Sequence, residues 1–132
     1  MIPLNELKFT KTHEWLRLDG RKAVVGITQH AQEEISDVVF VELPKVGKKL
    51  AQAEEAAVVE SVKAAFSIYA PVSGTVLQVN EALVKDPGSV NRSPYEEGWI
   101  FVLEPTQAQE AQSLMNHDQY EAWVAGEGKG AH

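Results

Sequence analysis

One lysine, Lys63, lies between two segments that are typical of β-strands. Residues 56–59 before it are apolar and β-prone, and residues 66–70 after it alternate apolar and polar side chains before Pro71. The link between them is short and made mostly of small residues, so Lys63 is expected at the tip of a β-hairpin. An amine in that position projects into water, which suits the covalent attachment of a carried group. The alternative interpretation is an ordinary solvated surface lysine.

His13 and Glu14 are adjacent and offer a second chemistry, an acid–base pair in an enzyme. No Cys or Ser nucleophile motif, glycine-rich phosphate loop or metal-ligand set accompanies them, so a carrier is favoured over an enzyme. The histidines His13, His30 and His117 are far apart in sequence and show no metal-ligand spacing, so each is expected to be a surface or half-buried group. An acidic metal site at Glu54, Glu55 and Glu60 is disfavoured against a solvated, charged face.

The elements that must position these residues are short strands separated by turns. Asp19-Gly20 is a turn dipeptide that predicts a hairpin between residues 14–18 and 22–27. Thr28 is expected to cap a short helix over residues 29–35. Further strands are expected at 38–43, which is apolar on both faces and therefore predicted to be central, and at 56–59, 66–70, 75–80 and 99–103. Many short strands with helix only at the margins indicate a β-sandwich or barrel.

After Pro105 the pattern changes to helical spacing. Thr106 and Gln109 form a capping-box pattern that predicts a helix over residues 107–115. A length of 132 residues suits one domain with one hydrophobic core. We therefore predict a single domain over residues 1–125, followed by a Gly-rich tail, 126–132, that is expected to be disordered.

The composition is that of an acidic, cysteine-free protein. A formal net charge of −7 gives no electrostatic reason to bind nucleic acid. The lack of cysteine removes disulfides, thiol nucleophiles and thiolate metal sites. No apolar run approaches membrane-spanning length, and no signal or transit peptide is visible at the start. We expect a cytoplasmic protein without nucleic-acid or membrane partners.

Motifs along most of the chain resemble the glycine cleavage system H-protein family. The lysine segment and the turn after it are similar to that family's lipoyl-lysine hairpin: Glu60-Ser61-Val62-Lys63-Ala64 and Tyr69-Ala70-Pro71-Val72-Ser73-Gly74. Other matches follow in the family's order: Thr12-His13-Glu14-Trp15, Val25–Gln32, Asp37–Pro44, Val79–Leu83, Val90-Asn91, Ser93-Pro94-Tyr95 and Gly98-Trp99. The resemblance extends from Phe9 to about Val124. Any one of these short motifs is weak evidence, but this many in the same order are specific to the family.

The resemblance implies a mainly β, barrel-sandwich hybrid fold, as in lipoyl and biotinyl domains. A short helix would follow the first hairpin, and the C-terminus would form a helical extension. The implied function is that of a non-catalytic, monomeric carrier with lipoic acid bound covalently to Lys63.

The resemblance also implies four partner enzymes. Glycine decarboxylase (P protein) would load an aminomethyl group from glycine onto the lipoyl arm. The aminomethyltransferase (T protein) would take its carbon and release ammonia. Dihydrolipoyl dehydrogenase (L protein) would reoxidise the arm, and a lipoylating enzyme would attach it.

Roles for the residues around the attachment site follow from the same resemblance. Glu60, Ser61, Val62 and Ala64 would shape the hairpin and serve recognition by the lipoylating enzyme, with Lys63 as its target.

Glu14 is the implied carboxylate of a cleft, where it would pair with the cationic amine of the loaded arm. Its alternative role is a surface strand residue balanced by Lys11 or Arg17. His30 and Glu34 are expected on a helix that forms the cleft wall. Some family members have a histidine where this chain has Glu34, so no specific contact is carried over to that position.

Three further interpretations stay open at this point. An H-like protein could relay lipoyl groups to other complexes, with loss of lipoylation on those complexes as its signature. A biotinyl carrier is disfavoured because that family places methionines beside its lysine, whereas Val62 and Ala64 are the neighbours here. A purely structural interaction module would leave Lys63 unmodified.

Overall fold

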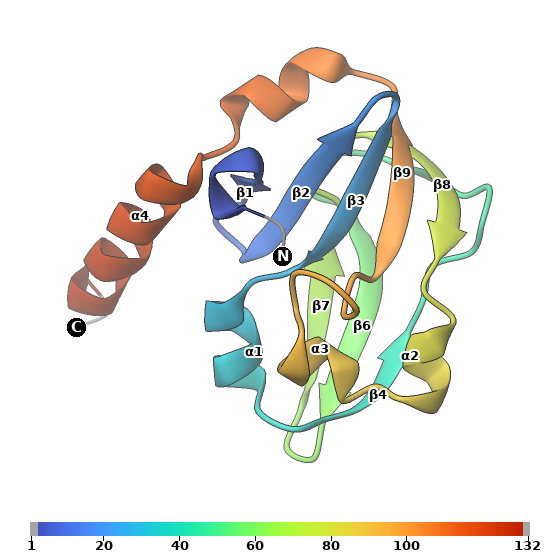
Figure 1. The fold of residues 1–132 in the computed structure, drawn as a ribbon, viewed down its shortest axis with the longest axis vertical. Coiled ribbons are helices and arrows are strands. Elements are labelled where there is room, and N and C mark those ends of the chain that lie inside the picture. The colour runs from blue at the N-terminus through green and yellow to red at the C-terminus, as the bar shows by residue number, and fades with distance from the viewer. Residues whose placement is uncertain (1–2, 131–132) are drawn as a thin grey trace.

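The computed structural model describes residues 3–130, which form two antiparallel sheets with short helices at their margins (Figure 1). The strands are β1 (Lys8–Phe9), β2 (Glu14–Asp19), β3 (Lys22–Ile27), β4 (Val38–Glu42), β5 (Lys49–Leu50), β6 (Glu55–Ser61), β7 (Ala65–Tyr69), β8 (Gly74–Val79) and β9 (Phe101–Pro105). The helices are α1 (Gln29–Ile35), α2 (Ala82–Lys85), α3 (Ser89–Arg92) and α4 (His117–Gly130), with 3-10 turns η1 (Leu4–Glu6) and η2 (Ala108–Ser113).

The two sheets enclose the main hydrophobic core. The larger sheet has the strand order β1-β2-β3-β9-β8-β5, and the smaller has the order β4-β6-β7. Alternate residues of their strands are fully buried, among them Leu16, Val25, Val59 and Leu103. The predicted mainly β architecture is therefore confirmed.

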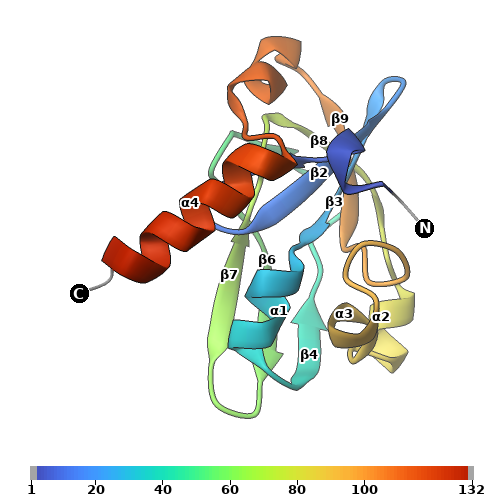
Figure 2. The same cartoon turned by 60° about the vertical axis from the view of Figure 1, so that its left-hand side comes forward.

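A second, smaller core joins the C-terminal helix to the N-terminal strands. It contains Leu7, Phe9, Trp15 and Tyr120. The rings of Phe9 and Tyr120 stack with centroids 4.8 Å apart. Helix α4 begins at this contact and then projects away from the sheets (Figures 1 and 2).

The first hairpin and the helix after it have the predicted positions. Asp19 pairs with Lys22, and the turn between them uses Gly20 at φ +63°, a conformation that glycine adopts without strain. The Thr28 hydroxyl accepts a hydrogen bond from the backbone N–H of Ala31 at 3.1 Å and so caps α1. The local sequence therefore determines where helix α1 begins.

Strand β4 is an edge strand, and the prediction of a central strand is wrong. It pairs with β6 on one side only, and Val39 and Phe40 are 52% and 49% exposed. An apolar pattern on both faces indicates burial but does not show how many strands pair with the segment. The pairing of β4 with β6 shifts register between Val38 and Phe40, and the apolar side chains at this irregular edge remain exposed.

The C-terminal segment differs from the sequence prediction in two ways. Residues 108–113 form a 3-10 helix instead of an α-helix over 107–115, and no side chain caps it. The Glu110 carboxylate instead accepts hydrogen bonds from the backbone N–H and hydroxyl of Ser73. Helix α4 continues through Gly130, so the expected disordered tail overlaps a helix at residues 126–130. Residues 131 and 132 lie outside the described residues.

Candidate functional site: the lysine hairpin and its groove

Lys63 lies at the tip of the β6–β7 hairpin, as predicted. Glu60 pairs with Ala65, and the N–H of Ser61 donates to the carbonyl of Ala64 at 2.8 Å, which closes the turn. Lys63 and its neighbours Val62 and Ala64 are exposed, and no described residue forms an ion pair with its amine. The turn extends beyond the sheets at one end of the molecule (Figures 1 and 2). The amine is therefore available to another protein.

The side chain of Ser61 organises this turn. Its hydroxyl oxygen accepts hydrogen bonds from the N–H groups of Lys63 and Ala64, both at 3.2 Å, and Ser61 is only 8% exposed. Neither Val62 nor Lys63 adopts a positive φ, so the turn is not the usual type I′ hairpin turn. A serine that accepts from N–H groups two and three residues ahead stabilises a turn of this kind. Ser61 thus fixes the position of the Lys63 backbone.

We expect Ser61→Ala to loosen the turn without unfolding the protein. Two N–H groups lose their acceptor, and the free energy of unfolding should fall by about 1 kcal/mol. Hydrogen exchange should lose protection at the amides of residues 63 and 64, with Ser113→Ala, an exposed serine remote from the hairpin, as the matched control. Unchanged protection at both amides would show that Ser61 does not hold the turn.

A groove runs beside strand β7, the strand that follows Lys63. It has a volume of about 120 Å³. One side consists of Phe66, Ser67 and Ile68 from β7, and helix α1 forms the facing wall. The remaining lining residues are Thr12, His13, Ile27, Ala31, Glu34 and Ile35. Glu34 therefore lies on the cleft wall as expected, and its neighbour His30 is on the same helix.

Glu14 is a buried carboxylate and not the surface residue that its alternative role required. Its exposed fraction is 0%. One carboxylate oxygen accepts hydrogen bonds from the hydroxyls of Thr10 and Thr12, both at 2.5 Å, and the other accepts from the N–H of Tyr69 at 3.0 Å. Pairing with Lys11 or Arg17 is therefore not how the charge is accommodated. The bond to Tyr69 ties Glu14 to the end of the strand that begins at the lysine turn.

Burial and hydrogen bonding act in opposite directions on Glu14. Burial raises the pKa of this carboxyl group above its ordinary 4.5, and the bonds from Thr10, Thr12 and Tyr69 lower the pKa without cancelling the rise. A cavity of about 290 Å³ lies against Glu14 and Tyr69 and shares Thr12 with the groove along β7. A cation that entered this cavity would meet a carboxylate in a poorly solvated environment, where attraction is strong.

The raised pKa predicts how stability depends on pH. Between pH 4.5 and the raised pKa of the folded state, the unfolded chain holds less of the Glu14 proton than the folded chain does, so the unfolding free energy falls as pH rises through this range. Glu14→Gln removes this dependence. Urea unfolding of both proteins from pH 4.5 upward should show that the stability of the original chain falls relative to that of the variant. If the stability of the original chain relative to the variant stays constant or rises with pH, the raised pKa of Glu14 is contradicted.

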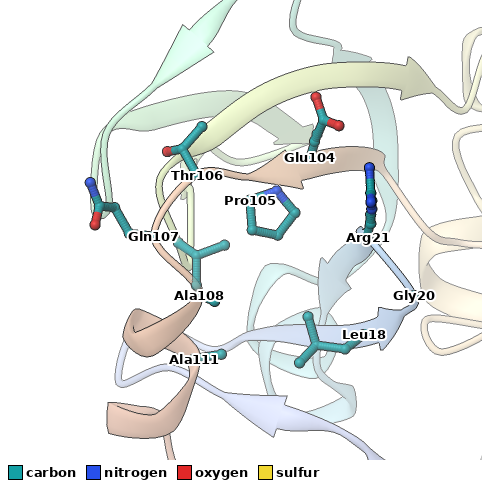
Figure 3. A pocket seen from close by; sticks show the side chains of 10 residues that line it. Leu18, Gly20, Arg21, Glu104, Pro105, Thr106, Gln107, Ala108 and Ala111 are labelled. Atoms are coloured by element: carbon teal, nitrogen blue, oxygen red, sulfur yellow. The ribbon is translucent and has the colours of Figure 1, made fainter.

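A further cavity lies far from the lysine. It has a volume of about 360 Å³ and lies at the opposite end of the sheets, near the β2–β3 turn and η2 (Figures 1 and 3). Leu18, Arg21, Pro105 and Ala108 are among its lining residues. It contains none of the predicted site residues.

Two histidines that are distant in sequence are neighbours in the structure. The rings of His13 and His30 have centroids 4.7 Å apart, and Nε2 of His30 is 2.6 Å from Oε1 of Glu34. Both are half-buried, as predicted, and they meet because the first hairpin returns the chain to α1. Only the i, i+4 spacing of His30 and Glu34 signals part of this cluster in the sequence.

Among the described residues, no helix is both long and apolar enough to cross a membrane.

The sequence is similar to known proteins over most of its length. Residues 7–127 match the family model described as glycine cleavage H-protein. The glycine cleavage system H protein of Endomicrobium trichonymphae is 54% identical over 115 residues, which cover 87% of this chain and 93% of that protein. Its counterpart in Legionella pneumophila (strain Corby) is 52% identical over 124 residues, covering 94% and 99%.

A solved structure has the same fold. The crystal structure of a glycine cleavage system H protein from Mycobacterium marinum superposes with a TM-score of 0.84 at 34% identity, and covers 94% of this chain and 99% of that one. This likeness confirms the predicted barrel-sandwich type of architecture with its C-terminal helical extension. The chain belongs to the glycine cleavage H-protein family.

Proposed function

We propose that this chain is the lipoylated carrier of a glycine cleavage system, with lipoic acid in amide linkage to Lys63. The observation that carries the proposal is one exposed amine at the tip of a hairpin whose turn is held by Ser61. Amide formation needs an accessible primary amine, and this position fits that requirement. Family membership supports the choice of lipoic acid over biotin as the attached group.

The chain contributes position and mobility to this function. Strands β6 and β7 hold the Lys63 backbone in place while the side chain stays in water, so a tethered group would have a high effective concentration at each docked enzyme. The bound lipoyl group would supply the redox-active disulfide that a cysteine-free chain lacks. The proposed partners are glycine decarboxylase, the aminomethyltransferase, dihydrolipoyl dehydrogenase and a lipoylating enzyme.

The groove along β7 is proposed to shelter the loaded arm from water. It begins two residues after the turn, at Phe66, and its lining includes the apolar side chains of Ile27, Ile68 and Ile35. Glu14 lies beyond it and is proposed to attract the cationic amine of the load. The carboxylate is preorganised for this role because Thr10 and Thr12 hold one of its oxygens.

Reconstitution tests the proposed function. The lipoylated chain, added to glycine decarboxylase, should release CO2 from [1-14C]glycine, and the unlipoylated chain should not. The relay function makes a different prediction, because deleting the gene would then remove lipoyl groups from unrelated complexes in the host. Release of CO2 without any need for the lipoylated chain would overturn the carrier proposal. The cytoplasmic location and the monomeric state stay predictions.

A further inference from the structure

Three potential metal ligands converge between helix α1 and the segment before β2. They are His13, His30 and Glu34, and one ligand atom from each lies within 4.8 Å of the other two. Among the described residues, this is the one group of at least three such side chains. His30 is 33% exposed and Glu34 is 61% exposed, so an ion can reach them from solvent.

The ligand types indicate which metals would bind. Two imidazoles and one carboxylate suit Zn²⁺ and related transition metals. Zinc sites with three protein ligands of these types leave the fourth coordination position open to water or another ligand. Ca²⁺ and Mg²⁺ would be poor fits, since they prefer oxygen ligands alone. Ligand atoms of a tetrahedral zinc ion lie roughly 3–4 Å apart, so side-chain adjustments of about 1 Å would close the set.

The fold also provides the outer partner that metal-binding histidines usually have. Nδ1 of His13 is 2.8 Å from the hydroxyl of Tyr120, which is itself 2.8 Å from the hydroxyl of Thr28. A histidine that coordinates a metal through one ring nitrogen commonly has its other nitrogen in such a hydrogen bond, which fixes the orientation of the ring. Tyr120 is 2% exposed and its ring stacks on Phe9, so packing in the second core positions its hydroxyl.

The backbone of His13 is held in an uncommon conformation. Its φ is +72°, in the left-handed region, and it is kept there by hydrogen bonds from its N–H to Thr10 and from the N–H of Thr28 to its carbonyl. This conformation directs the ring toward α1, where it meets His30. We propose that His13, His30 and Glu34 form a binding site for a divalent transition metal, with Zn²⁺ as the best-matched ion.

A second histidine–glutamate pair provides an internal control. His117 and Glu121 have the same i, i+4 spacing in α4, with Nε2 and Oε1 3.4 Å apart, but they do not belong to a three-ligand group among the described residues. The proposal predicts that this pair does not bind zinc comparably, because two ligands alone hold the ion weakly.

The test uses the full unlipoylated chain, because a reduced lipoyl arm would itself bind zinc through sulfur. A His132→Asn background removes the fourth histidine of the sequence. Calorimetric titration with Zn²⁺ should show saturable 1:1 binding, and imidazole ¹⁵N spectra should shift at His13 and His30 but not at His117. The outcome does not depend on lipoylation, so it is separate from that of the proposed function.

Matched variants decide the assignment. His13→Asn, chosen because asparagine tolerates a positive φ, and Glu34→Gln should each weaken zinc binding by at least about tenfold, and His117→Asn should leave it unchanged. Tyr120→Phe should weaken it by roughly tenfold through the outer hydrogen bond. Far-UV circular dichroism spectra that match the parent at the titration temperature would show that the variants are folded. Absence of saturable binding, or equal binding by parent and His13→Asn proteins, would overturn the proposal.

Discussion

Lys63→Arg should abolish lipoylation completely. The lipoylating enzyme must acylate a primary amine, and the guanidinium group of arginine stays protonated and does not form this amide. Arginine keeps the positive charge and the length of the side chain, and the position is exposed, so the fold should be unaffected. Intact mass after incubation with a lipoate ligase, ATP and lipoate should show one added lipoyl group on the original chain and none on the variant.

Lys85→Arg is the control for this experiment. Lys85 is an exposed lysine at the end of α2, outside the hairpin, and its replacement should leave full loading. In the reconstituted glycine reaction, CO2 release should fall to background with Lys63→Arg and stay normal with Lys85→Arg. Loading of the Lys63→Arg protein would mean that another lysine is the target.

Trp15→Ala should cause the largest loss of stability. The side chain is fully buried, and its indole N–H donates to the carbonyl of Pro94 at 3.0 Å. The ring packs directly on Gly26, where an added Cβ would lie 2.7 Å from the indole atoms. Truncation removes this packing and leaves a cavity, and the buried carbonyl of Pro94 loses its hydrogen-bond donor. The free energy of unfolding should therefore fall by about 3–5 kcal/mol. The melting temperature should fall by roughly 10–20 °C.

Trp123→Ala provides the comparison. Trp123 is half-buried on α4, where its ring contacts His13 with centroids 5.4 Å apart. Its truncation should cost about 1 kcal/mol, as expected for a partly exposed side chain. Equal losses for the two variants would contradict the assignment of Trp15 to the core that joins α4 to β1.

Local patterns explain why much of the fold could be predicted. The alternation around Lys63, the Asp19-Gly20 turn and the Thr28 cap each determine their own element, and all three have the predicted positions. Burial of Glu14 was not visible in this way. Only the family resemblance implies a cleft position for Glu14, because a lone carboxylate at the start of a predicted strand is typical of a surface residue.

Tertiary contacts account for what could not be predicted. Strand β4 has a core-like apolar pattern, but the three-stranded sheet leaves it at an edge with Phe40 exposed. The helix expected over residues 107–115 tightens to a 3-10 helix where Glu110 binds Ser73. His13 and His30 meet only because β2 and β3 form a hairpin, a contact between residues 17 positions apart that periodicity cannot reveal.

Peptide mass spectrometry on protein purified from its native host tests the carrier account most directly. A protease fragment that spans residues 58–69 contains a single lysine, Lys63. The account predicts that this fragment carries one lipoyl group, and that fragmentation places it on the lysine side chain. An unmodified fragment in cells that oxidise glycine, or a lipoyl group on a different lysine, would contradict it.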